Sequence, residues 1–167
     1  MMGLLLFIYV PGIQAQTSQT KLNQVDLLIH FVGSWKCDIG KDTTCFWEAR
    51  SYGTGIVGNF KYVTEMKTID EGNQLIGYDK SIDKFIDVEL RKGKDVKIFT
   101  IGFLSQNKCE IILYHDFPNM RNASIKEELV FKTPDMFVES IIVNEKTLNS
   151  YTFTRDSLGS NAGGRAP

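Results

Sequence analysis

The sequence is poor in the residues that hold most metal and redox centres, with three cysteines and two histidines among its 167 residues. It has no C-x-x-C and no H-E-x-x-H motif, and the adjacent His115 and Asp116 would point to opposite faces of a strand. It also lacks the G-x-S-x-G motif that would present a nucleophilic serine. We therefore expect no metal site, no cofactor and no enzymatic activity.

A surplus of one charge sign is also missing, because 19 Lys and Arg nearly balance 20 Asp and Glu. No basic run stands out, so nothing favours a nucleic-acid partner or an anionic membrane surface. After residue 16 no apolar run is long enough to cross a bilayer, so we expect no integral membrane association. The sequence leaves the oligomeric state open.

Residues 1–15 form a separate segment, in which the apolar run Gly3–Val10 is followed by Pro11-Gly12 and by Ala15. This pattern is typical of the core and cleavage site of a secretory signal peptide. No Lys or Arg precedes the run, so we expect a truncated start or a wrongly assigned first Met; the alternative is a buried N-terminal strand. The mature chain would begin near residue 16 and be exported, periplasmic or secreted, with 157–167 as a flexible tail.

The three cysteines are an odd number, which in an exported protein allows one disulfide and one remaining thiol. Cys37 and Cys45 lie on two runs joined by Gly40–Thr43, so a disulfide across this hairpin is the expected pairing. A Cys37–Cys109 disulfide would close a much longer loop. Three reduced, buried thiols are the third alternative.

The rest of the chain predicts one short helix followed by about ten strands. Apolar residues at helical spacing favour a helix over Lys21–Phe31 that could close a barrel end. Downstream, runs such as Ile86–Leu90 alternate apolar and polar residues, which is typical of antiparallel strands with the apolar residues on the core. Turn-like clusters, among them Asp70–Asn73, separate these runs every 11 to 15 residues. Gly53–Gly58 matches G-x-G-x-x-G, but a strand pattern follows it, so we interpret it as a connection between strands.

An open sheet of this size would expose two edges, and closing it into a barrel removes them. The sequence therefore predicts an all-β, up-and-down antiparallel β-barrel over residues 16–156. Gly33-Ser34-Trp35 at the start of the first strand and Arg155 at the end of the last are similar to the lipocalin-like (calycin) superfamily. Stretches over Lys21–Arg155 resemble exported bacterial lipocalin-like domains of unknown function. The resemblance implies that Arg155 packs over Trp35 by a cation–π contact and that Gly33 opens the strand. It implies no activity, cofactor or agreed ligand.

Glu127 is the polar residue that we single out for ligand contact. If Ile125 and Leu129 face the core, Glu127 shares their face and Glu128 is in solvent. A buried carboxylate needs a partner, for which Arg50 and Tyr114 are candidates. The alternative is a position on the rim that is wetted by solvent.

We expect a binding protein for a small apolar or amphipathic ligand in the barrel interior. The expected lining comprises Glu127 and six aromatic residues: Trp47, Phe60, Tyr62, Phe99, Tyr114 and Phe131. Two alternatives remain, a packed barrel that acts as a protein-interaction module and an enzyme at the barrel mouth. A barrel of this size is either filled by side chains or holds one small ligand, so a cavity decides between them.

Overall fold

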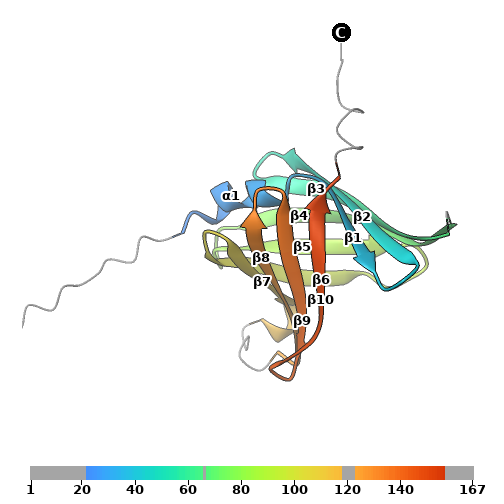
Figure 1. Cartoon of the computed structure of the whole chain (residues 1–167). Helices are drawn as coiled ribbons and strands as arrows, with labels where there is room; N and C mark the ends of the chain where they lie inside the picture. The colour runs from blue at the N-terminus through green and yellow to red at the C-terminus, as the bar shows by residue number, and fades with distance from the viewer. Residues whose placement is uncertain (1–21, 66, 118–122, 157–167) are drawn as a thin grey trace, which may run out of the picture.

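Ten antiparallel strands close into one barrel in a computed structural model, which describes residues 22–65, 67–117 and 123–156. Each strand pairs with the next along the chain, and β1 pairs with β10 (Figure 1). The strands are β1 Gly33–Ile39, β2 Thr43–Tyr52, β3 Gly55–Thr64, β4 Lys67–Asp79, β5 Lys84–Arg91, β6 Lys97–Ser105, β7 Lys108–Leu113, β8 Ile125–Thr133, β9 Met136–Val143 and β10 Lys146–Arg155. The fold class predicted from the sequence is confirmed. The expected signal segment 1–15 and tail 157–167 lie outside the described residues.

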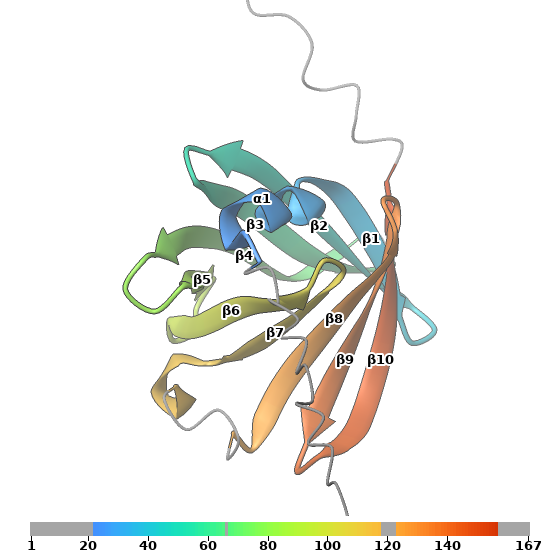
Figure 2. The ribbon, with the colours of Figure 1, turned by 90° about the vertical axis from the view of Figure 1, so that its left-hand side faces the viewer.

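A short helical segment, α1 Gln24–Leu27 followed by the 3₁₀ turn η1 Leu28–Phe31, lies across one end of the barrel (Figure 2). A helix this short is not stable alone, so tertiary contacts must hold it. The Gln24 amide donates to the Phe103 carbonyl at 3.0 Å and accepts from the Phe103 N–H at 2.7 Å. Phe31 is buried inside the barrel below it. Over the described ranges, no helix has the length and apolar character needed to cross a membrane.

Trp35 and Arg155 join the first strand to the last, as directly opposed residues of β1 and β10. The guanidinium carbon of Arg155 lies 4.0 Å from the centre of the Trp35 ring, and Arg155 also donates to the Val32 carbonyl. Gly33 makes room for this arrangement, since its φ is +136° and a Cβ there would overlap the Arg155 guanidinium.

Aromatic side chains pack the end of the barrel under the helix, which we call the capped end. Trp35, Phe31 and Phe137 are at most 2% exposed. The Phe137 ring lies 4.8 Å from Trp35 and 4.7 Å from Phe153, between ring centres. Phe131 belongs here too, with its ring 5.4 Å from that of Phe31. This end of the interior is therefore filled by side chains.

One expected turn is wrong, because Asp70–Asn73 lies inside β4. Gly72 is there for close packing: a Cβ at this position would come within 2.4 Å of the Phe60 ring and 2.6 Å of the Leu90 carbonyl oxygen. Asp70 forms ion pairs with Arg91 and Lys94. The Gly53–Gly58 stretch does connect strands, since it forms the β2–β3 turn and the first residues of β3.

Candidate functional site

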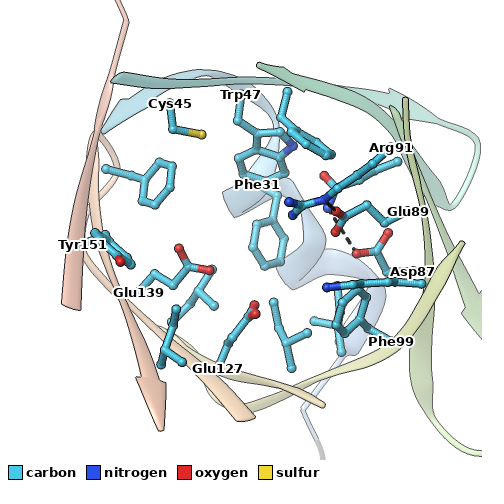
Figure 3. A pocket seen from close by; sticks show the side chains of 18 of the residues that line it. Phe31, Cys45, Trp47, Asp87, Glu89, Arg91, Phe99, Glu127, Glu139 and Tyr151 are labelled. Carbon is cyan, nitrogen blue, oxygen red and sulfur yellow. Dashed lines mark hydrogen bonds and ion pairs between the residues drawn. The ribbon is translucent and has the colours of Figure 1, made fainter. Parts of the chain in front are cut away.

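The half of the barrel away from the helix holds a cavity of about 630 Å³. Its floor is made by capped-end rings, including Phe31 and Phe137, and its walls by aliphatic and aromatic side chains from the surrounding strands. Charged and amide side chains also reach into it, from one side on β4 and β5 and from the other on β8 and β9 (Figure 3). The interior is thus amphipathic, with an apolar floor and polar groups above it.

Five of the seven residues expected to line the interior do so: Trp47, Phe60, Tyr62, Phe99 and Glu127. The other two do not line this cavity. Phe131 is packed in the capped end, at 5% exposure. Tyr114 leaves the barrel wall because β7 ends at Leu113, and it lies on the 3₁₀ turn η2 Tyr114–Asp116 with 47% of its surface exposed.

Strand β5 carries a row of charged residues into the barrel, and here the orientation expected for Ile86–Leu90 is wrong. Asp87 and Glu89 are only 3% and 6% exposed, whereas Leu90 is 51% exposed. The orientation of β5 follows from Phe85, which is fully buried. Asp87, Glu89 and Arg91 follow at every second position and therefore point to the same side of the strand. Burial of Phe85 therefore turns the two acids inward.

Arg91 neutralises part of this charge. Its guanidinium pairs with Glu89 and lies 3.3 Å from the Asp70 carboxylate. It also lies over the rings of Phe60 and Tyr62, at 5.0 and 5.8 Å from their centres. These contacts hold Arg91 in one place and satisfy Glu89 and Asp70.

Asp87, by contrast, has no basic partner in the part of the chain that the structure describes. Its Oδ2 accepts from the Gln74 amide at 3.3 Å, while Asp87 Oδ1 and Gln74 Oε1 are buried without a hydrogen-bond partner. The Trp47 Nε1 is a third such atom, and Gly58 leaves the space that this indole and the Gln74 amide occupy. Burial, followed by the neighbouring Glu89 and Glu127, raises the pKa of Asp87 to about 8.

Glu127 and Glu139 form a pair of carboxyl groups on neighbouring strands, diagonal to each other in the β8–β9 register. Burial and the proximity of Glu127 raise the pKa of Glu139 to about 8, which favours a proton shared between the two carboxyl groups. Burial also raises the pKa of Glu127. The partner of Glu127 is thus Glu139, and neither Arg50 nor Tyr114 fills that role: Arg50 is exposed and Tyr114 lies outside the barrel wall.

The three cysteines are free and buried, so the expected Cys37–Cys45 disulfide is not formed. The two residues are directly opposite each other on β1 and β2, as the hairpin register requires. Burial raises the pKa of the Cys37 thiol to about 11 and that of Cys45, which lines the cavity, to about 12. Within the described ranges, no group of three or more His, Cys, Asp or Glu residues is arranged to hold a metal ion.

Sequence reasoning found most of the aromatic wall but missed the inward groups on β4 and β5. Asp87, Glu89 and Arg91 occur at every second position after Phe85, and this shared parity is the signal that could have revealed them. Gln74 and Asp70 were hidden because the Asp70–Asn73 stretch has the composition of a turn.

The closed ten-strand antiparallel barrel is consistent with a lipocalin-like fold. Comparison of the chain with models of protein families gives no match. Comparison with curated proteins gives none either.

Proposed function

We propose that this protein is a lipocalin-like binding protein that holds a small amphipathic ligand in the barrel interior. The observation that carries the proposal is the cavity of about 630 Å³, with apolar walls and a few buried polar atoms that have no partner in the described part of the chain. Ligand pockets commonly have volumes of roughly 300–1,000 Å³ and combine apolar walls with a small number of polar groups. Together with the resemblance at Gly33-Ser34-Trp35 and Arg155, these features favour a ligand carrier that is exported from the cell.

The interior distinguishes this proposal from a packed barrel that binds proteins through its outer face. Side chains fill the capped end but leave a cavity in the other half of the barrel, although a fully packed core would be more stable than one with a void. A cavity that is kept open against this tendency favours an internal ligand.

The cavity also gives little support to covalent catalysis. Cys45 is the thiol on its wall, and with a pKa of about 12 it stays protonated at neutral pH. Since the thiolate is the nucleophilic form, this side chain is a poor nucleophile. Binding without chemistry is the function that the geometry favours.

Native mass spectrometry of the protein, purified from cells that produce it, tests the proposal. We expect a reproducible excess mass that is lost on denaturation. An Ile111→Trp variant should lose this mass because the larger ring fills the cavity, whereas Leu104→Trp, exposed on the neighbouring strand, should retain it. A bare chain mass, combined with no thermal stabilisation by fatty acids, sterols or long-chain alcohols, would contradict the proposal.

A further inference from the structure

We propose that the ligand is an amphipathic organic cation, whose ammonium group lies among Asp87, Glu127 and Glu139 while its apolar part contacts the aromatic and aliphatic walls. This inference rests on the proposed function and names the chemical class of its ligand. It goes beyond a cavity of suitable size, because it assigns the polar group of the ligand a sign of charge and a position.

The charge inside the cavity is the first argument. Among the described residues, five acidic side chains but only two basic ones, Arg91 and Lys97, line it. Arg91 is already engaged by Glu89 and Asp70, and Lys97 is an exposed residue at the start of β6. In the part of the chain that the structure describes, no salt bridge joins a basic side chain to Asp87, Glu127 or Glu139. The three carboxyl groups, which we call the acidic centre, therefore form no salt bridge among the described residues, although the charges of Lys97 and Arg91 act to lower the pKa of Glu127.

The unpartnered atoms are the second, independent argument. Asp87 is 97% buried, since its exposure is 3%, and its Oδ1 has no hydrogen-bond partner among the described residues. Gln74 Oε1, beside it, is a second acceptor in the same condition. When Asp87 is ionised, its Oδ1 is a buried acceptor without a donor, which is costly, and an ammonium group has only donors to offer. Trp47 Nε1 and Thr100 Oγ1 are also unpartnered among the described residues. The Trp47 indole N–H is a donor, but its ring faces the same cavity, where a cation is also favoured.

Other ligand classes fit this centre less well. An anionic amphiphile, such as a fatty acid, would bring its carboxylate against three carboxyl groups and would be repelled by any that are ionised. A bare metal ion needs several oxygen ligands converging on one point, and no such group exists in the described part of the chain. An organic cation needs only nearby negative charge and an apolar enclosure, both of which the cavity provides.

Binding of a cation should release protons. With pKa values of about 8, Asp87 and Glu139 are largely protonated in the empty barrel at neutral pH. An ammonium group beside them favours their ionised forms and lowers their pKa values, so protons leave as it binds. The charged groups that face these carboxyls are Asp70, Glu89, Glu127, Arg91 and Lys97. The other titratable groups that Glu139 influences, Cys37, Cys45, Tyr62 and Cys109, have pKa values raised by burial and stay neutral.

Matched probes of equal chain length test the ligand class: decylamine, decyltrimethylammonium, decanol and decanoic acid, titrated into the full-length protein by calorimetry at pH 7. We expect at least one of the two cations to bind about tenfold or more tightly than decanol, and decanoic acid to bind most weakly. If decanol or decanoic acid binds as tightly as the cations, the inference is wrong and the proposed function stands. If none of the four binds, both fail.

Two variants locate the charge. Asp87→Asn and Glu139→Gln should each reduce decylamine affinity about tenfold or more while leaving decanol binding within about twofold. Glu128→Gln is the control, since Glu128 lies next to Glu127 in the chain but pairs with Lys108 at 2.7 Å on the outer face. Equal losses for decylamine and decanol would mean that the substitutions act on the shape of the cavity, which contradicts the assignment.

Proton counting on the unaltered protein gives a test that does not depend on whether a variant folds. Decylamine binding, measured in buffers of different ionisation enthalpy, should release protons at pH 7, whereas decanol should release none. Its affinity should rise between about pH 6 and pH 8, by up to about tenfold per pH unit for each proton released. Tight decylamine binding without proton release and with a flat pH profile would overturn the placement of the ammonium group among these carboxyls.

Discussion

The two halves of the barrel differ although the same strands build both. On β9, Phe137 is packed in the capped end, and two residues later Glu139 faces the cavity. On β5, Phe85 and Asp87 show the same division, and on β8 it is shown by Phe131 and Glu127. An inward side chain therefore contributes to packing or to the cavity according to its distance from the helix. The strand period alone does not separate these two roles.

The difference also separates stability from binding. In the capped end, large rings are in contact and the indole N–H of Trp35 donates to the Phe31 carbonyl at 2.9 Å. In the open half, Asp87 is withdrawn from water and Glu127 and Glu139 are half-buried, and none of the three forms a salt bridge among the described residues, which opposes folding when they are ionised. A protein built only for stability would place apolar residues at these positions, so their presence favours a role in binding.

The largest effect that we expect comes from truncating the capped end. Trp35→Ala should lower the free energy of unfolding by about 3–5 kcal/mol, because it leaves a cavity in a fully packed cluster and removes the ring beneath Arg155. Phe99→Ala should cost less than about 2 kcal/mol, since the Phe99 ring already borders a cavity and loses fewer contacts. Urea unfolding of both variants measures the two losses in the free energy of unfolding. Equal losses would remove the distinction between a packed half and an open half.

A smaller loss of stability is expected from a substitution at the start of β1. Gly33→Ala should destabilise the protein by about 1–3 kcal/mol, because the backbone there has a φ of +136° and the added Cβ would displace the Arg155 guanidinium. Gly77→Ala is the matched control, as a Cβ on that strand glycine meets nothing within 4 Å. Thermal unfolding should therefore separate the two variants. A stable Gly33→Ala protein would mean that the contact between Arg155 and Trp35 does not hold the two ends of the chain together.

The acidic centre of the open half should make stability depend on pH. Asp87 and Glu139 have pKa values of about 8 when folded, against about 4 for an unfolded carboxyl, so between these values the folded state binds more protons. The free energy of unfolding should thus decrease as pH rises from about 4 to about 8, with a slope of up to about 1.4 kcal/mol per pH unit for each group. Asp87→Asn and Glu139→Gln should each flatten this profile. A flat profile in the unaltered protein would show that these carboxyls are ionised when folded.

The capped end and the barrel itself were within reach of the sequence. Alternation, turn spacing and the Gly33-Ser34-Trp35 pattern are local signals, and closure follows from the need to cover sheet edges. The acidic centre could not be predicted from the sequence, because alternation tells which residues share a face of a strand but not which face points into the barrel. On β5, two acids and three aliphatics favour the wrong orientation, and only the neighbouring strands and Phe85 reverse it. The pairing of Glu127 with Glu139 likewise depends on a diagonal contact that needs the β8–β9 register.

Cysteine labelling gives the smallest effect and the finest comparison of the two halves. Cys45 lines the cavity, whereas Cys109 is fully buried and does not. Burial raises both thiol pKa values, more so for Cys109, so both react slowly in the folded protein. We expect iodoacetamide at pH 8.5 to modify Cys45 several times faster than Cys109, as measured by mass spectrometry of peptides. A bound cation that fills the open half should slow Cys45 alone, whereas equal rates at the two thiols, with or without ligand, would mean that labelling requires global unfolding and reports nothing of the cavity.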